Sequence, residues 1–321
     1  MSRIYEALQK AESKRKLERR EPELRIPNLP VSATMTAAVA EPEDAVFSMP
    51  HFTEAPIVTD PYAEPSTRHV GGESLDLSKI PARPWALSLT QLPALLDRGP
   101  AVEQFRSLRS RIFELRDISP LKTILVSSGV PQEGKSFIST NLALSLARHK
   151  NSKVLLIDGD MRRYTLHQIL GCESHPGLAD YLAGKTNLLD VMQRPEMSQA
   201  PTAAATPILP NLTFIAGGNG GDKAADLSGS PRFGELIRQV APHFDWIIVD
   251  SSPVLPVSDA VNLARWCDGV LLVARGGVTK FHIAQRAQSE LKASNILGFV
   301  LNAVQETPET GGYYGYEATA Q

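Results

Sequence analysis

Short runs of almost uninterrupted apolar residues recur through the middle and later parts of the chain. They cover residues 123–127, 154–157, 212–216, 246–249, 269–274 and 298–301. Strands that are buried on both faces of a sheet show this pattern. Because helix-length segments separate the runs, the pattern predicts an α/β fold, a doubly wound and mostly parallel sheet. A helix is also predicted before the first strand, where apolar residues from Val102 to Leu115 keep close to a 3.6-residue period.

The segments that flank this pattern differ from it. Residues 1–20 carry Ile4, Leu8 and Ala11 at helical spacing among many charges, which predicts a short docking helix or, equally, a solvated charged helix. Residues 21–85 form a predicted linker, largely disordered, because the stretch from 21 to 84 holds ten prolines and little apolar periodicity. The predicted globular domain covers residues 86–306, with a surface loop at 194–210, and a flexible Tyr-rich tail covers 307–321.

Composition narrows the possible classes of protein. The 321 residues are 42 % apolar with a formal net charge of -2, a near-neutral balance that disfavours nucleic acid as a partner. Cys172 and Cys267 do not form a metal-type pair, so neither a zinc site nor a disulfide framework is indicated, which suits a reducing cytosol. No run resembles a signal peptide or a spanning helix, so we expect a cytoplasmic protein whose membrane association is peripheral or depends on a partner.

A phosphate-binding motif follows the first predicted strand. The segment Gly129-Val-Pro-Gln-Glu-Gly134-Lys135-Ser136 matches G-x-x-x-x-G-K-S/T completely and precedes a helical run. Backbone N–H groups of such a loop surround phosphate oxygens, the lysine reaches the β/γ-phosphates, and the serine hydroxyl can ligate Mg²⁺. A glycine turn that binds nothing is the alternative. We therefore expect ATP and Mg²⁺ as cofactors. The expected nucleotide-binding residues are Gly129, Gln132, Glu133, Gly134, Lys135, Ser136 and Phe137.

Two acidic segments follow later strands of the predicted sheet. Asp158 and Asp160 come directly after the run 154–157, and Asp250 follows the run 246–249 as in a Walker B motif. The carboxyl ends of strands are where a doubly wound sheet binds its ligand. An isolated strand-end Asp is as often a helix cap or turn former. The phosphate loop in the same chain favours a role in metal binding or catalysis.

These motifs resemble those of the bacterial tyrosine kinases, a deviant-Walker branch of the P-loop ATPases that also contains septum-positioning and plasmid-partitioning ATPases. The likeness covers about residues 100–316. Asp158-Gly-Asp160 is similar to the family's Walker A-prime motif, residues 250–260 to its Walker B region, and residues 176–184 to its intervening pattern. The chain departs from the family at Ser251-Ser252-Pro253, where Thr-Pro-Pro is usual, and at 217–222, which replaces a Pro-Asn-Pro loop.

Two further features separate the kinases from the other ATPases of this branch. Glu103, Arg106 and Arg109 match the E-x-x-R-x-x-R motif through which the kinases resemble ring-forming assemblies, although an exposed helical ion pair explains the same spacing. The tail carries Tyr313, Tyr314 and Tyr316, which are candidate phosphoacceptors unless the tail is inert. From Val304 to Tyr313 an extended chain spans at most about 30 Å, enough to enter a neighbour's site.

The main alternative is an ATPase that acts as a molecular switch without modifying protein. Partitioning and septum-positioning ATPases usually begin their phosphate loop with Lys-Gly-Gly, and this chain has Ser127-Ser128-Gly129 there. The missing lysine and the tyrosine tail both favour the kinase. A kinase-like scaffold that has lost phosphoryl transfer remains a third reading.

The resemblance implies a mechanism and a setting. The γ-phosphoryl of ATP would pass to a tyrosine hydroxyl, with Lys135, Asp158 and Asp160 catalytic and with Asp158 the preferred base. The expected metal ligands are Ser136, Asp158, Asp160 and Asp250, and the division of roles among the three aspartates stays open. Implied partners are other copies in a ring, a separate Wzz-like membrane polysaccharide co-polymerase that activates the kinase, and an opposing tyrosine phosphatase. The implied process is exopolysaccharide or capsule synthesis at the inner face of the membrane.

Overall fold

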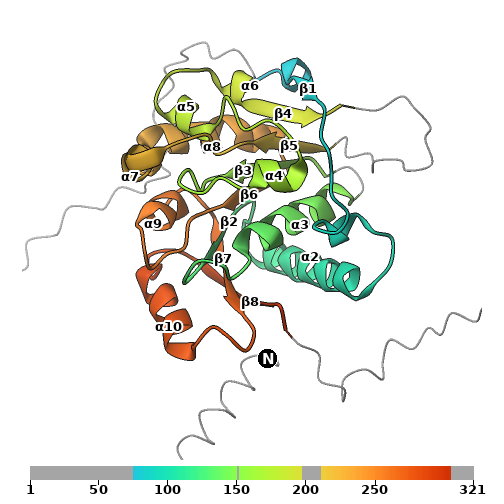
Figure 1. Ribbon diagram of the computed structural model, residues 1–321, viewed down its shortest axis with the longest axis vertical. Coiled ribbons are helices and arrows are strands. Elements are labelled where there is room, and N and C mark those ends of the chain that lie inside the picture. Colours follow the sequence, from blue (N-terminus) through green and yellow to red (C-terminus); the bar gives the residue numbers. More distant parts are fainter. Residues whose placement is uncertain (1–74, 150–151, 197–210, 305–321) are drawn as a thin grey trace, which may run out of the picture. The chain divides into compact units, whose positions relative to one another are not determined.

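A computed structural model describes residues 75–149, 152–196 and 211–304. These residues form one mixed sheet in the strand order β1-β4-β5-β3-β6-β2-β7-β8, with helices packed on it (Figure 1). All neighbouring strands are parallel except β4 and β5. The strands are β1 Ala82–Arg83, β2 Thr123–Ser128, β3 Val154–Asp158, β4 Met192–Pro195, β5 Leu212–Ile215, β6 Trp246–Asp250, β7 Gly269–Arg275 and β8 Ile296–Asn302.

Most of the connections between these strands contain helices. They are α2 Pro100–Ile118, α3 Lys135–Ala147, α4 Leu166–Leu170, α5 Leu178–Leu182, α6 Leu188–Val191, α7 Ala224–Ser228, α8 Pro231–Val240, α9 Asp259–Ala264 and α10 Phe281–Glu290. Short 3-10 turns occur at Leu77–Lys79, Pro93–Leu95, Gly221–Lys223 and Ala241–His243. In the part of the chain that the structure describes, no helix combines the length and apolar character needed to cross a bilayer.

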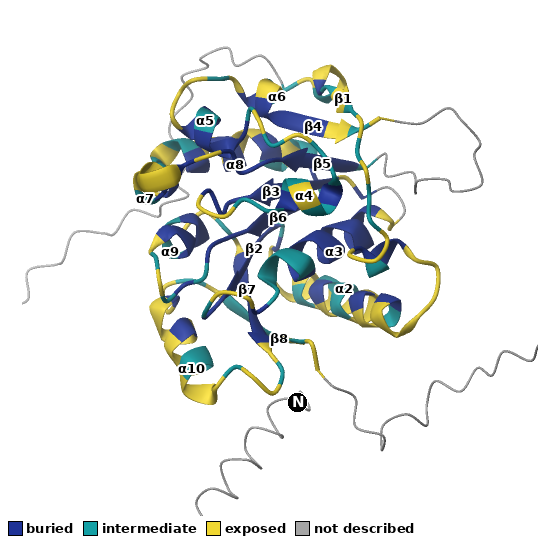
Figure 2. Ribbon diagram, viewed as in Figure 1, coloured by how far each residue is buried: buried dark blue, intermediate teal, exposed yellow. Residues whose placement is uncertain are grey.

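The central strands are buried on both faces, as their apolar runs predict (Figure 2). Alternate residues contribute to two cores because successive side chains of a strand point to opposite faces. Leu155 and Ile157 pack with residues of α5, α8 and α9, whereas Val154 and Leu156 pack with residues of α2 and α3. Because helices cover both faces of the sheet, a ligand cannot bind on either face. The loops at the carboxyl ends of the strands remain accessible, and a ligand site is expected there.

The six predicted strands and the predicted first helix are confirmed. Two short strands were missed. Arg194 and Pro195 lie in β4, which pairs antiparallel with β5, so the predicted loop over 194–210 began too early. Residues 197–210 lie outside the described residues.

The predicted end of the linker, residue 85, is also corrected. Ala82–Arg83 form edge strand β1, Ile80 is buried with 3 % of its surface exposed, and Trp85 packs edge-on against Phe214. β1 pairs over only two residues and the segment buries a single side chain, so the sequence shows little apolar periodicity there. The prolines around these residues make the strand still harder to recognise from the sequence. The predicted helix at 1–20, the linker before residue 75 and the tail at 307–321 lie outside the described residues.

Candidate active site

The phosphate loop connects β2 to α3, as its motif requires. Gln132 and Gly134 have positive φ values of 66° and 92°, and Gly134 is the residue before α3 begins at Lys135. A Cβ at Gly134 would lie 1.9 Å from the Asn302 amide nitrogen, so a larger residue would displace that side chain. The loop is therefore shaped to present backbone N–H groups at the start of a helix, where a phosphate is stabilised.

Glu133 holds the loop from within. Its buried carboxylate accepts a hydrogen bond from the Val130 N–H at 3.0 Å and another from the Thr279 hydroxyl, and its carbonyl accepts one from Asn302 Nδ2 at 3.0 Å. Sequence reasoning placed Glu133 among the nucleotide-binding residues. In the structure, the Glu133 side chain makes hydrogen bonds within the protein. Only the Glu133 backbone N–H is therefore left to bind a phosphate. Thr279 and Asn302 belong to no recognised sequence motif, so the sequence did not predict their contacts with the phosphate loop.

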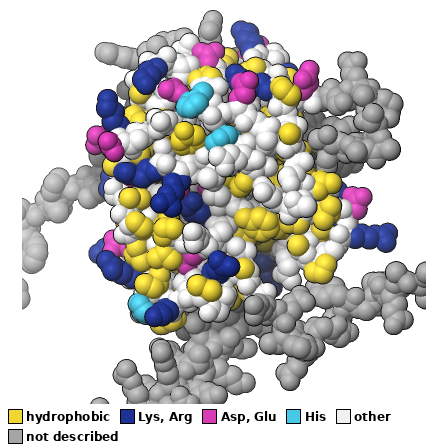
Figure 3. Space-filling model, in the orientation of Figure 1, with side chains coloured by type: hydrophobic (Ala, Val, Ile, Leu, Met, Phe, Trp, Pro, Cys, Tyr) yellow, Lys and Arg dark blue, Asp and Glu magenta, His cyan; other side chains and the backbone are white. Residues whose placement is uncertain are grey.

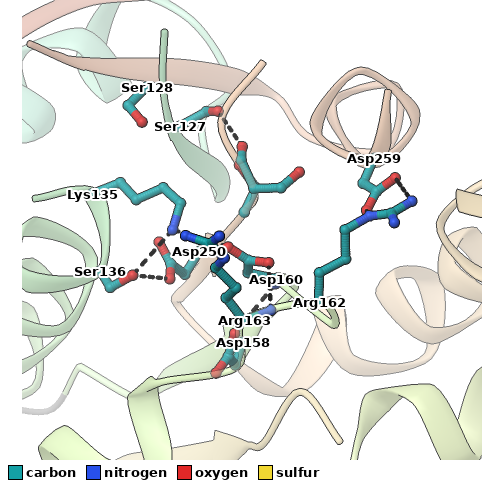
Figure 4. Close-up of polar contacts among 12 residues, drawn as sticks. Ser127, Ser128, Lys135, Ser136, Asp158, Asp160, Arg162, Arg163, Asp250 and Asp259 are labelled. Atoms are coloured by element: carbon teal, nitrogen blue, oxygen red, sulfur yellow. Dashed lines mark hydrogen bonds and ion pairs between the residues drawn. The ribbon is translucent and has the colours of Figure 1, made fainter. Parts of the chain in front are cut away.

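Strand pairing brings the acidic segments to the loop. β3 and β6 are neighbours with Asp158 opposite Asp250, so both carboxylates emerge at the same edge of the sheet. Lys135 Nζ lies 3.1 Å from Asp160 Oδ2, and the Ser136 hydroxyl donates a hydrogen bond to Asp250 Oδ2 at 2.7 Å (Figure 4). The predicted catalytic and metal-binding side chains thus lie in one cluster.

The cluster holds more negative than positive charge in a buried setting. Asp158, Asp160 and Asp250 are each at most 2 % exposed and surround the single ammonium of Lys135. Burial raises the pKa of Asp158 well above its ordinary range, and the neighbouring Asp250 charge adds to this. Burial also raises the pKa of Asp250, against the opposing effects of Lys135 and the Ser136 hydroxyl. Burial disfavours the Lys135 ammonium, but the charges of Asp250 and Asp160 outweigh it and raise the pKa of Lys135.

The cluster fits a hard divalent cation. Among the described residues, Asp250 Oδ1 is fully buried without a hydrogen-bond partner, directly beside the Ser136 hydroxyl that contacts the other oxygen of the same carboxylate. Oxygen atoms of carboxylates and hydroxyls are the ligands that Mg²⁺ prefers. Asp158 differs, since Oδ1 accepts the Asp160 N–H at 3.2 Å and Oδ2 accepts the Leu166 N–H at 3.1 Å. Its oxygens are therefore less free for a metal than those of Asp250.

A second ion pair, which sequence reasoning missed, joins the two acidic segments. Arg162 Nε lies 2.7 Å from Asp259 Oδ2, and its Nη2 donates to Asp259 Oδ1 at 3.3 Å. Asp259 stands in the Walker B region already singled out, but its partner could not be read from spacing. On the face drawn in Figure 3, Lys and Arg side chains gather between α9 and the loop after β3, which carries Arg162 and Arg163. A cationic rim of this kind attracts an anionic nucleotide.

Comparisons with known proteins agree with this geometry, although no family model matches the chain. It is 31 % identical over 216 residues to the tyrosine-protein kinase YwqD of Bacillus subtilis, covering 66 % of this chain and 86 % of that one. This chain belongs to the bacterial tyrosine kinases. The tyrosine-protein kinase ptk of Acinetobacter johnsonii is 32 % identical over 215 residues.

Solved structures share the fold of this chain. The kinase domain of Escherichia coli ETK is 31 % identical with a TM-score of 0.57, covering 67 % of this chain and 80 % of that one. The chimerical protein CapA2B2 is 25 % identical with a TM-score of 0.60, covering 71 % and 96 %. The chain spans 27 % of the length of the first curated relatives that it matches, the Acinetobacter kinase and the EpsB proteins of Ralstonia.

The E-x-x-R-x-x-R motif of this chain lies on α2, away from the cluster. Glu103 and Arg106 form an ion pair at 2.5 Å with both side chains 44 % exposed. Arg109 instead turns toward α3 and donates to the Ser145 carbonyl at 2.7 Å. Two residues of the motif are thus available to another molecule, and the third also connects two helices. The phosphoacceptor candidates Tyr313, Tyr314 and Tyr316 lie outside the described residues.

Proposed function

We propose that this chain is an ATP- and Mg²⁺-dependent protein tyrosine kinase that phosphorylates Tyr313, Tyr314 or Tyr316 of a second copy. One observation carries the proposal. A phosphate loop, a lysine, a serine hydroxyl and a buried carboxylate oxygen without a partner converge at one sheet edge in a member of the bacterial tyrosine kinases. Mg²⁺ bound by Ser136 and Asp250, with Asp160 close by, would neutralise charge on the phosphate oxygens.

The residues of this chain would divide the reaction as follows. Backbone N–H groups at the end of the phosphate loop and the start of α3 hold the phosphates, and Lys135 exchanges Asp160 for the γ-phosphoryl oxygens. The tyrosine oxygen forms the new bond to phosphorus as the bond to the ADP oxygen breaks, and the phenolic proton passes to Asp158. A phenol of pKa about 10 is protonated at neutral pH, so a carboxylate close to its hydroxyl would assist the transfer.

Intact-mass spectrometry tests the proposal. Purified protein, dephosphorylated beforehand, is incubated with Mg-ATP, and any added phosphate is mapped by peptide fragmentation. We expect phosphate on the tail tyrosines that is absent from Lys135→Met. Hydrolysis of ATP without added mass would favour instead the molecular switch, or a kinase that requires its membrane activator.

Asp158→Asn tests the division of roles. We expect it to abolish tyrosine phosphorylation while ATP binding, measured by fluorescence with a labelled nucleotide, stays largely intact. Asp226→Asn, an exposed carboxylate on α7, is the control. Phosphorylation retained by Asp158→Asn would assign the base elsewhere.

The biological setting is proposed with the activity. The kinase would assemble as a ring through Glu103, Arg106 and Arg109 and serve exopolysaccharide or capsule synthesis beside a membrane polysaccharide co-polymerase. A tyrosine phosphatase would reverse its modification, and residues 1–20 would help to recruit it from the cytoplasm to the membrane. Fluorescent fusions in cells test recruitment. A chain that begins at Leu75, which keeps β1 and the buried Ile80, and still localises to the membrane would remove residues 1–20 from this role.

A further inference from the structure

A pocket separate from the phosphate loop lies between α2, the turn Pro93–Leu95 and the far end of α3. Its volume is about 220 Å³, and Val102, Phe105, Arg106, Arg109 and Arg148 are among the residues that line it. The phosphate loop meets the first residue of α3, whereas the pocket meets Ser145 and Arg148. At 1.5 Å per residue, the two places are about 15 Å apart along the helix axis. The pocket is therefore not part of the nucleotide site.

The three arginines are fixed in place by backbone carbonyl groups. Arg109 donates to the Ser145 carbonyl at 2.7 Å, and Arg148 Nη1 donates to the Ala94 and Leu96 carbonyls, each at 2.9 Å. Arg106 Nη2 donates to the Asp97 carbonyl at 3.1 Å. Each guanidinium carries more N–H donors than these contacts use. The side chains are positioned without being saturated, so donors remain for a ligand.

Positive charge is in excess at this pocket. Glu103 pairs with Arg106 and Asp97 pairs with Arg148, but Arg109 contacts only a neutral carbonyl. Burial lowers the pKa of Arg109, and the charges of Arg106 and Arg148 lower it further. Like charges held close together without a matching number of carboxylates favour the arrival of an anion.

Val102 and Phe105 contribute only a small apolar part of the lining. They are 3 % and 6 % exposed, and Phe105 belongs to the core beneath α2. A volume of about 220 Å³ is below the roughly 300–1,000 Å³ of pockets that enclose a drug-sized ligand, so one side chain fits better than a nucleotide. A dianionic group at the end of one side chain would meet the three arginines. Guanidinium forks bind phosphate oxygens in this way.

We propose that this pocket binds a phosphotyrosine side chain from the tail of a second copy of this chain. The proposal rests on the proposed kinase function for the origin of the phosphotyrosine. It gives the α2 motif a second use beyond ring contacts, because phosphate bound at Arg106 competes directly with Glu103. The autophosphorylation state of one copy would then be sensed on α2 of its neighbour.

Binding of a synthetic peptide tests the proposal without requiring the chain to be a kinase. The probe is residues 309–319 phosphorylated on Tyr314, titrated by calorimetry into the full-length Lys135→Met protein after phosphatase treatment. The unphosphorylated peptide and inorganic phosphate are the other two probes. We expect the phosphopeptide to bind at least about ten-fold tighter than either. Equal affinity for the unphosphorylated peptide, or for inorganic phosphate, would overturn the assignment to phosphotyrosine.

Variants on the same helix locate the site. Arg106→Gln should weaken phosphopeptide binding about ten-fold, and Glu103→Gln should strengthen it several-fold, because it removes the competing carboxylate. Arg111→Gln is the matched control, since Arg111 forms the same type of i,i+3 ion pair, with Glu114, outside the pocket. Equal affinities for Arg106→Gln and Arg111→Gln would overturn the proposal. The chain could bind the phosphopeptide with this order of affinities among the variants and still fail to phosphorylate its tail. That result would support the phosphotyrosine pocket and contradict only the proposed kinase activity.

Discussion

At Asp250 the chain keeps a fully buried carboxylate whose Oδ1 has no hydrogen-bond partner among the described residues. A native protein tolerates such an atom where a ligand uses it. Asp158 and Asp160 lie near it, and Lys135 is the cation within this buried cluster. At the residue scale, therefore, the features that suit the site for a metal are the same ones that cost stability when the site is empty.

Asp250→Asn should raise the thermal stability of the nucleotide-free protein at neutral pH. Burial raises the pKa of Asp250 above 3.8, so between the unfolded and folded pKa values the folded state binds more protons. Stability then falls as pH rises through that window. We expect Tm to rise by a few degrees at pH 7.5, with no gain at a pH below the unfolded pKa. Differential scanning fluorimetry across pH measures this.

The same substitution should remove the stabilisation that Mg-ATP gives the wild-type protein, because a metal ligand is lost. Asp226→Asn, which changes an exposed carboxylate, should alter neither property. A lower Tm for Asp250→Asn than for the wild-type protein at pH 7.5 would contradict the prediction that the Asp250 charge destabilises the nucleotide-free protein.

Arg162→Ala should destabilise the fold because it leaves the buried Asp259 carboxylate without its ion-pair partner. Asp259 is 1 % exposed and Arg162 is 32 % exposed, so the pair is partly screened on one side. A loss of about 2 kcal/mol in the free energy of unfolding is expected, below the roughly 3–5 kcal/mol for a fully buried pair. Urea denaturation measures it. Arg163→Ala, which changes the exposed neighbour, is the control, and equal losses for both variants would contradict the prediction.

At the scale of elements, the apolar runs identified every central strand because burial on both faces leaves a strong and continuous signal. β1 and β4 left no such signal, since each is short and their pairing depends on β5, which is distant in sequence. The site residues likewise divide into those that the sequence indicated and those that it did not. Lys135, Ser136 and the three aspartates stand in local motifs and were found. Thr279 and Asn302 contact the phosphate loop only through the tertiary fold, so no spacing could have indicated them.

The N-terminal edge of the folded unit gives an element-scale prediction. Ile80 is 3 % exposed and packs in the core beside β1, although it lies in the segment predicted as linker. Ile80→Ala should reduce the free energy of unfolding by about 2–4 kcal/mol, because it leaves a cavity. Leu89→Ala, at a position 45 % exposed, should cost much less. Equal urea midpoints for wild type and Ile80→Ala would mean that residues 75–85 add nothing to the folded unit.

At the scale of the whole molecule, the proposed kinase acts on another copy rather than on itself, and a mixing experiment separates the two routes. One partner is full-length Lys135→Met, which keeps Tyr313, Tyr314 and Tyr316 but lacks the lysine that contacts Asp160. The other ends at residue 304, which keeps every described residue of the site but carries no tail. Neither partner alone should gain phosphate with Mg-ATP. If transfer occurs in trans, the mixture should place phosphate on the tail of the Lys135→Met chain, at a rate that rises with the concentration of the truncated partner. A full-length wild-type chain that labels itself, beside a mixture that gains nothing, would instead require the tail to reach the phosphate loop of its own domain.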